Sequence, residues 1–267
     1  TLGYSKEASA FSAASALYAE GVARRLAEDP QLRSWAKEVL AGSDSVSTGS
    51  SYGKLLGRDS LLAKSPWATT LTDEREEEQK LARFLLATDR ATTTDQLLKR
   101  LSDLQGTDGL WSWYPGMKGS LYTTEYVLRI LLRLSATEGL EQALRLRLSS
   151  MIRRGIGALN AQAAKDLAEI QKFKREKRVF IPHTGLDYLY LSALAKEQKL
   201  QSLSAEAERA ERYFLTQLRG EAHRLSLDSK PRAAVALLLA GDKALAKDLA
   251  ESLRQHLKED ETGLFFA

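Results

Sequence analysis

The sequence predicts an all-α protein in which two kinds of helix alternate. Leucine-rich stretches with apolar residues at spacings of three and four recur along the 267 residues, and this spacing is typical of helices. Proline is scarce, at five residues, which favours long uninterrupted helices. Amphipathic stretches alternate with largely apolar ones, as in a helical repeat array or a closed α/α toroid of inner and outer helices. A strict repeat of about 34 or 40 residues is absent, so the repeat array is the weaker alternative.

Two helices are expected first, over residues 7–27 and from Pro30 onward. Proline suits the first turn of a helix, where its missing N–H needs no partner. Residues at spacings of three and four form one apolar stripe on the first helix: Phe11, Ala14, Leu17 or Tyr18, Gly21 or Val22, and Leu26. Residues 42–53 are rich in serine and glycine and have almost nothing to bury, so we expect a flexible surface loop there.

The later helices are placed by capping residues and apolar periodicity. Thr72 with Asp73, and then Asp95, are expected to start two of them. Further helices are expected at 121–134, 138–159, 186–194, 204–218, 231–240 and 243–257. No sheet is expected. One internal echo is present: residues 104–111 resemble residues 257–265, because in each a leucine-rich helix ends, an acidic turn reaches glycine and an aromatic residue follows.

Composition excludes several kinds of site. There is no cysteine, so no disulfide, thiolate metal site or cysteine nucleophile can form. The formal net charge is only +4, which does not argue for nucleic-acid binding. No apolar run approaches the length of a membrane span, and the first residues lack the basic-then-apolar start of a signal peptide. We interpret residues 1–267 as a single domain of a longer protein.

The most informative stretch is 104–126, which holds two of the four tryptophans and a dense group of turn-forming residues. Within it, Gln105, Gly109 and Trp111 fit the pattern Gln-x3-Gly-x-Trp, in which glycine takes a backbone angle that a β-carbon would resist. We expect the amide of Gln105 to bond exposed backbone groups at a neighbouring helix end. Asp108 is expected to stabilise the turn, and Trp111 to cover it. The pattern resembles one that recurs at helix ends in terpenoid-cyclase-like α/α toroids, which predicts a structural role.

The fuller segment resembles the toroid of bacterial alpha-2-macroglobulins, the thioester-domain region. The likeness is carried by Leu-Gln-x2-Asp-Gly-x-Trp-Ser-Trp-Tyr-Pro-Gly-Met and by Tyr-Thr-Thr-Glu-Tyr-Val-Leu at 122–128. In that family a helix carrying Phe-Ser and then Tyr-Ala follows a Cys-x-Glu-Gln thioester motif, and residues 11–12 and 18–19 stand in that arrangement here. The four motif positions then hold Lys6, Glu7, Ala8 and Ser9. These residues supply neither the thiol nor the glutamine acyl group that a thioester needs.

The resemblance implies a toroid, incomplete at the C-terminus, that acts without catalysis or cofactor in an alpha-2-macroglobulin-like protease inhibitor. Its implied partners are other, mostly β-sandwich domains of the same polypeptide and a trapped protease, with no nucleic acid and no direct membrane insertion. The implied location is the periplasm or cell envelope, where the parent chain can carry a lipid anchor. Four aromatic residues are expected to form a contact surface: Trp113, Tyr114, Tyr122 and Tyr126.

Two other functions are weighed against this one, a helical-repeat scaffold and a carbohydrate-active toroid enzyme. The enzyme would stack aromatic side chains on sugar rings and use a carboxylate pair as acid and base. Its aromatic candidates are Trp111, Trp113 and Tyr114, and its acidic candidates are Asp108, Glu125 and Asp187. Metal binding is not indicated, because His183, His223 and His256 do not have metal-ligand spacing. Residues 172–178 are strongly basic but hold a single aromatic residue, so a nucleic-acid site is not favoured.

Overall fold

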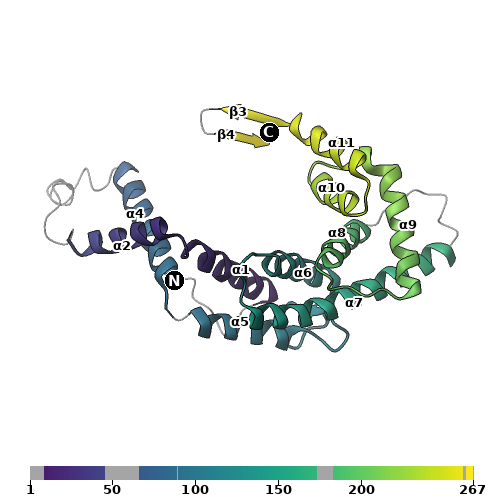
Figure 1. Cartoon of the computed structure of the whole chain (residues 1–267), viewed down its shortest axis with the longest axis horizontal. Coiled ribbons are helices and arrows are strands. Elements are labelled where there is room, and N and C mark those ends of the chain that lie inside the picture. The colour runs from purple at the N-terminus through teal and green to yellow at the C-terminus, as the bar shows by residue number, and fades with distance from the viewer. Residues whose placement is uncertain (1–8, 46–65, 89, 173–182, 261–262, 267) are drawn as a thin grey trace. The chain divides into compact units, whose positions relative to one another are not determined.

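The computed structural model describes residues 9–45, 66–88, 90–172, 183–260 and 263–266. Ten α-helices and one short 3-10 helix make up most of these residues (Figure 1), so the prediction of an all-α protein is confirmed. The packing of the backbone divides the described chain into two compact units. Of the described residues, the first unit comprises 15–45, 66–88 and 90–99, and the second comprises 9–14, 100–172, 183–260 and 263–266.

The first unit contains most of α1 (Ala10–Leu26), then α2 (Pro30–Ser45), α4 (Pro66–Leu86) and the greater part of α5 (Arg90–Leu104). α2 packs against α4. The buried core of these helices is small and rich in alanine: Ala23, Ala36, Ala82 and Leu85. An ion pair between Arg90 and Glu20 supplements it, with 2.6 Å between Nη1 and Oε2 and both side chains largely buried.

Three boundaries in this unit differ from the predicted ones. One is the start of α5, which lies at Arg90, ahead of the expected Asp95. α2 continues to Ser45, so residues 42–45 of the expected loop are helical, and residues 46–53 lie outside the described residues. A glycine in a helix costs about 1 kcal/mol relative to alanine, which the last turns of an established helix can tolerate. α4 begins at Pro66, ahead of the expected start at Thr72 and Asp73, because proline suits the first turn.

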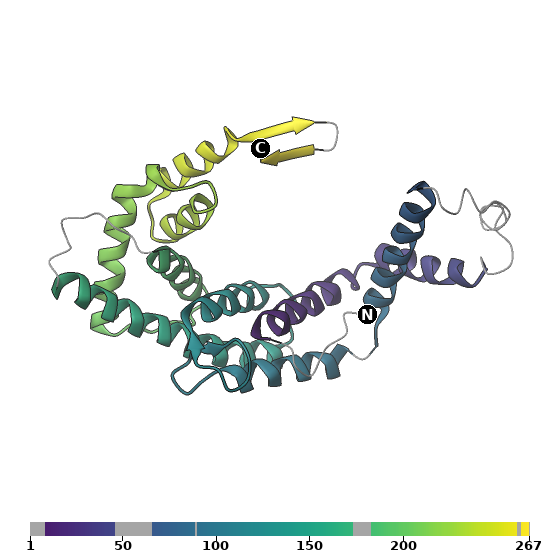
Figure 2. The same cartoon turned by 180° about the vertical axis from the view of Figure 1, so that it is seen from behind.

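The second unit is built from helices that pack in succession. They are α6 (Leu121–Ser135), α7 (Gln142–Lys172), α8 (His183–Glu197), α9 (Ala205–Glu221), the 3-10 helix η2 (Ala222–Arg224), α10 (Lys230–Leu239) and α11 (Lys243–Arg254). α8 lies between α6 and α10 in both ribbon views and contacts each of them (Figures 1 and 2). α7 contacts α6, α8 and α9, and α11 contacts α10. The helices α6, α8 and α10 therefore form one row that α7, α9 and α11 flank.

Two short antiparallel hairpins are present, although the sequence predicts no sheet. β1 (Trp111–Ser112) pairs with β2 (Gly119–Ser120), and β3 (Leu257–Asp260) pairs with β4 (Gly263–Phe266). β3 begins at a residue that was expected to end the last helix. The internal echo has a structural counterpart, because Gln105 pairs with Trp111 and the equivalent Lys258 pairs with Phe265. Backbone pairing across an acidic turn is thus common to both copies.

Candidate functional site: the Trp111 turn, an aromatic surface and a buried charge cluster

The side chain of Gln105 ties the Trp111 turn (residues 105–111) to α7. Its Nε2 donates to the carbonyl of Gly109 and to the carbonyl of Met151, each at 3.0 Å. A carbonyl oxygen has two lone pairs, so Met151 can accept this bond in addition to one from its own helix. The sequence predicts a bond to a helix end, but the carbonyl of Met151 lies inside α7. Gln105 therefore fixes the turn against the side of a helix.

Gly109 brings the turn into direct contact with the backbone of α7. Its φ is +85°, and a β-carbon at this position would lie 2.3 Å from the carbonyl oxygen of Arg154. Only glycine combines this backbone angle with this approach. Asp108 is exposed, and its Oδ1 accepts a hydrogen bond from the N–H of Leu110 at 3.0 Å, as in an Asx turn. The Nη2 of Arg154 donates to the carbonyl of Gly106 at 2.7 Å, which closes the turn from the α7 side.

Trp111 is fully buried and packs beneath the turn. Its Nε1 donates to the carbonyl of Leu101 at 2.8 Å, and its backbone N–H donates to Oγ1 of Thr124 at 2.9 Å. A β-carbon at Gly155 would approach the indole to 2.6 Å, so this glycine of α7 makes room for the ring. Trp111 thus joins α5, α6 and α7, and its side chain is not available to a ligand.

The start of α1 packs against the segment that follows Trp111. The N–H of Ala10 donates to the carbonyl of Trp113 at 3.0 Å. Ser9 is buried, and its Oγ accepts a hydrogen bond from the N–H of Ser12 at 3.2 Å, so it caps the helix. Lys6, Glu7 and Ala8 lie outside the described residues. Of the four positions where a thioester motif is expected, the one that is described holds a helix cap.

Phe11 is the centre of an aromatic surface that also includes Trp113, Tyr114, Tyr122 and Tyr126. Its ring centroid lies 4.3 Å from that of Tyr126, 4.7 Å from Trp113 and 5.7 Å from Tyr122. Tyr114 stacks on Trp113, at 6.5 Å between centroids. The structure therefore brings together all four residues that the sequence proposes as a contact surface. The sequence places Phe11 on the apolar stripe of its helix and in the Phe-Ser pair of the family resemblance, but not in a contact surface. Its place here could not be predicted because α1 and residues 113–126 meet only in the tertiary structure.

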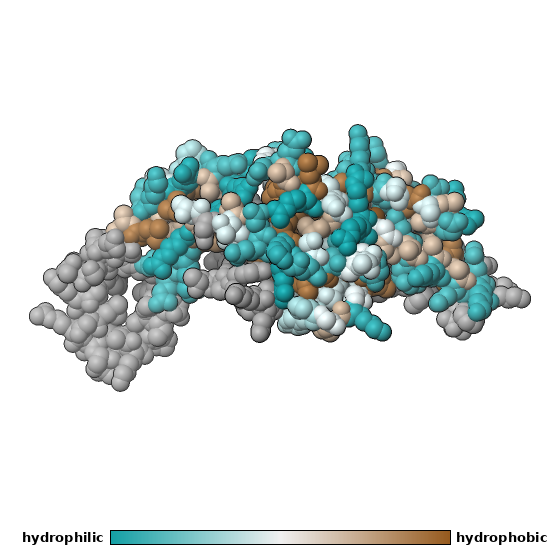
Figure 3. Space-filling view, turned by 90° about the horizontal axis from the view of Figure 1, so that it is seen from below, coloured by the Kyte–Doolittle hydropathy of each residue, from teal (hydrophilic) through white to brown (hydrophobic). Residues whose placement is uncertain are grey.

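This surface exposes more aromatic area than a packed core would. Tyr122 is 65% exposed, Tyr114 45% and Trp113 43%, and the neighbouring Met117 is also exposed. On the face shown in Figure 3, hydrophobic residues lie in groups among hydrophilic ones. A contiguous exposed aromatic group of this kind is typical of an interaction site.

Four charged side chains form a buried charge cluster in the row of α6, α8 and α10: Glu125, Arg129, Asp187 and Arg232. The Oδ1 of Asp187 accepts hydrogen bonds from Arg129 at 3.1 Å and from Arg232 at 2.7 Å. Asp187 is only 3% exposed. A buried carboxylate is stable when it is paired in this way, and removing one partner would leave a charge without compensation.

Glu125 lies beside this pair of bonds but does not share them. It is 7% exposed, and within the described part of the chain no hydrogen bond reaches its carboxylate. Burial, and then the negative charge of Asp187, raise the pKa of Glu125 to about 7, against the opposing effect of Arg129 and Arg232. Near neutral pH this carboxyl group is therefore divided between its protonated and ionised forms.

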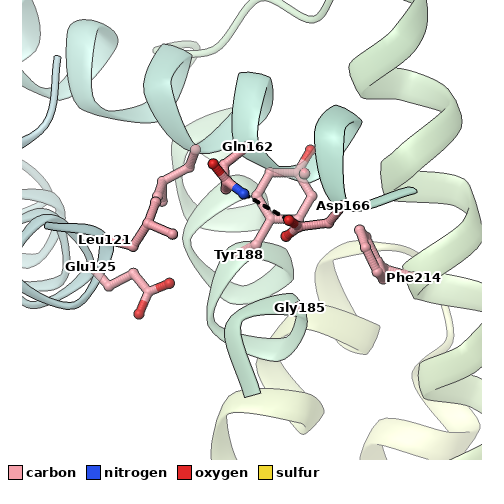
Figure 4. Close-up of a pocket in the computed structure, with 9 residues that line it drawn as sticks. Leu121, Glu125, Gln162, Asp166, Gly185, Tyr188 and Phe214 are labelled. Atoms are coloured by element: carbon pink, nitrogen blue, oxygen red, sulfur yellow. Dashed lines mark hydrogen bonds between the residues drawn. The ribbon is translucent and has the colours of Figure 1, made fainter. Parts of the chain in front are cut away.

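Glu125 also lines a small pocket between α6, α7, α8 and α9 (Figure 4). Other walls come from Leu121 of α6, Asp166 of α7, Tyr188 of α8 and Phe214 of α9. The free volume is about 10 Å³, which is room for about one water molecule. Burial also raises the pKa of Asp166, although a 2.7 Å hydrogen bond from Gln162 opposes the shift.

The aromatic and acidic candidates of the enzyme alternative do not share a groove. Trp111 is inside the core, Asp108 stabilises an exposed turn, and the pocket at Glu125 is lined by neither Trp113 nor Tyr114. Sequence analysis missed the two arginines of the charge cluster. The sequence did contain an indication of them, because each arginine stands in a largely apolar helix. A charged residue in such a position usually has a buried partner.

None of the described helices combines the length and the apolar character that crossing a membrane requires. Among the described residues, no three histidine or acidic side chains are grouped as a metal ion would need. Comparison of the chain with protein-family models, with curated proteins and with solved structures finds no match.

Proposed function

We propose that this chain is the non-catalytic α/α-toroid domain of an alpha-2-macroglobulin-like protease trap that has lost its thioester. In this proposal it packs against other domains of a larger polypeptide in the periplasm or cell envelope. It also contacts the protease that the polypeptide traps. The observation that carries the proposal is the contact between the start of α1 and the segment 104–128, through Ala10, Phe11 and Trp113. These two stretches hold the residues on which the family resemblance rests.

The helix arrangement of the second unit also supports a toroid. Its helices α6, α8 and α10 lie in one row, and α7, α9 and α11 flank them. Glu125 is the fifth residue of α6 and Asp187 is the fifth residue of α8. Neighbouring helices of the row therefore contribute acidic residues from equivalent turns. An inner ring of parallel helices has this property.

The chemistry of the trap would be non-covalent. Covalent capture in a thioester protein needs a cysteine thiolate and an activated glutamine acyl group, and the chain has no cysteine. Ser9 uses its hydroxyl to cap α1. Retention of a protease would then depend on enclosure and on surface contacts, for which the aromatic surface around Phe11 is the best candidate.

The proposal is tested on the full-length polypeptide with a panel of proteases. We expect cleavage at one site to make the polypeptide more compact, as measured by small-angle scattering. The bound protease should then digest large protein substrates slowly while it still cleaves small peptide substrates. Labelled methylamine should not be incorporated. Flanking domains that are not β-sandwiches, or cleavage without any compaction, would contradict the proposal.

The aromatic surface is tested within the same assay. Tyr122→Ser and Trp113→Ser should weaken protease retention, because each removes exposed aromatic area from the surface. Leu146→Ser is the matched control, since Leu146 is 64% exposed on α7 and Tyr122 is 65% exposed on α6. Equal retention by all three variants would show that this surface does not contact the protease.

A further inference from the structure

We propose that Glu125 is a proton-binding site that couples α6 to α8 and α10, so that uptake of a proton tightens the packing of these three helices and its release loosens it. The proposal goes beyond the protease-trap function and holds whether or not the chain serves in a trap. It rests on three features of the second unit: the placement of the charges, the hydrogen bonds of Asp187 and the pocket that opens on Glu125.

The placement of the charges comes first. Each helix of the row contributes to the charge cluster: α6 contributes Glu125 and Arg129, α8 contributes Asp187, and α10 contributes Arg232. Asp166 of α7 lines the same pocket as Glu125. Ionised Glu125 and Asp187 together balance the two arginines, but both carboxylates are buried and repel each other. The balance of charge therefore does not by itself decide which form of Glu125 is preferred.

Burial without a hydrogen bond favours the neutral form of Glu125. Both guanidinium groups already donate to Oδ1 of Asp187, and none of the hydrogen bonds in the described residues reaches Glu125. The ionised form of Glu125 is therefore buried next to the Asp187 carboxylate without a hydrogen bond among the described residues. Burial and the repulsion between the two carboxylates favour the neutral acid, and the two arginines oppose it.

The pocket borders Glu125 and residues that are partly open to solvent. Its lining includes the half-buried Leu121, Gln162 and Asp166 and the buried Glu125, Tyr188 and Phe214 (Figure 4). The free space admits about one water molecule and no organic ligand. Glu125 can therefore exchange a proton through this water while the helices remain packed.

The direction of the effect follows from linkage. The pKa of Glu125 rises from 4.5 to about 7 on folding, so the folded state holds the proton more tightly than an opened one. The stabilisation is complete below about pH 4.5 and is lost as the pH rises through about 7. Opening of the helix row should become roughly 30-fold more favourable between about pH 5.5 and about pH 8.

The test is hydrogen exchange of the whole chain, read by mass spectrometry on peptides from α6, α8 and α10. After correction for the intrinsic pH dependence of exchange, we expect protection of these helices to fall roughly 30-fold over this range. Glu125→Gln keeps a neutral side chain of the same shape, so it should flatten the profile. At about pH 8 the variant should be better protected than the original chain. Glu197→Gln removes an exposed carboxylate of the same α8 and should leave the profile unchanged.

The variant Asp166→Asn shows whether the second carboxyl group of the pocket, and not Glu125, causes the pH dependence. A profile that flattens in this variant and not in Glu125→Gln would overturn the proposal, as would protection that is independent of pH in the original chain. If Glu125→Gln does not fold, infrared spectroscopy of the original chain still decides the question. A protonated carboxyl band that disappears with a midpoint near pH 7 supports the proposal, and the absence of such a band above about pH 6 refutes it.

Discussion

The Trp111 turn and the charge cluster lie in the same unit and both contact α6, but their polar groups are stabilised in different ways. In the turn, the side chains of Gln105, Asp108 and Trp111 each make a hydrogen bond to a backbone group. In the charge cluster, Asp187 takes both arginine bonds and Glu125 takes none. The hydrogen bonds that Gln105 and Trp111 make in the turn thus do not depend on a titrating group, whereas the cluster contains one carboxyl group whose protonation depends on pH.

The difference shows how local and long-range polar groups are stabilised. The turn is assembled from residues close in sequence and then fastened to α7 by Gln105 and Gly109. The cluster depends on three helices whose residues are far apart in the chain. A substitution in the turn should therefore act through packing and show little dependence on pH, while one in the cluster should act through charge.

The largest effect is expected for Trp111→Ala. The indole is fully buried among α5, α6 and α7, so its loss should lower the free energy of unfolding by about 3–5 kcal/mol. Trp113→Ala is the control, because Trp113 is 43% exposed and should cost about 1 kcal/mol. Urea unfolding followed by circular dichroism measures both. Similar losses for the two variants would mean that Trp111 is not a core residue.

Gly109→Ala should follow, at about 2–4 kcal/mol. It combines an unfavourable positive φ with a β-carbon 2.3 Å from the Arg154 carbonyl oxygen, and both effects require the backbone to move. Gly116→Ala isolates the first effect, since Gly116 has a φ of +79° and no atom within 4 Å of the added carbon. That control should cost about 1 kcal/mol. Equal destabilisation would show that close approach to α7 does not matter.

Asp187→Asn should cost about 1–3 kcal/mol. It removes the carboxylate that both guanidinium groups share, but Arg232 keeps a 3.6 Å ion pair with Asp228. The two arginine side chains are 29% and 18% exposed, so water offsets a further part of the loss. Asp242→Asn breaks a more exposed pair with Arg219 and should cost less than about 1 kcal/mol. Calorimetry of both variants makes the comparison. An Asp187 variant as stable as the Asp242 variant would mean that the cluster contributes little to stability.

The smallest effect is expected for Asp108→Ala. The carboxylate is exposed and makes a single hydrogen bond to the N–H of Leu110, so the loss should be about 0.5–1 kcal/mol. The change should be the same at low and high salt, because the bond orders a turn and does not pair two charges. A loss above about 2 kcal/mol would indicate a further role for this residue.

Sequence reasoning predicted the parts of the site that depend on neighbouring residues. The glycine at 109, the Asx turn at Asp108 and the covering role of Trp111 follow from the allowed backbone angles and the turn chemistry of one short stretch. It did not predict that Gln105 reaches a carbonyl inside α7, nor that Phe11 packs against Trp113. Both contacts join segments that are far apart in the sequence. Apolar periodicity predicts where helices form but not which helices pack together.

By itself the sequence determined the helical class, most helix positions, the absence of any thiol and the form of the Trp111 turn. These depend on apolar spacing, composition and local backbone preferences, which act over one or a few turns of chain. Only the tertiary structure decided the division into two units, the aromatic surface around Phe11 and the cluster in which Asp187 is paired and Glu125 is not. The reason is physical: burial and electrostatic coupling are properties of a position in space, and the same glutamate in an exposed helix would titrate as an ordinary carboxyl group.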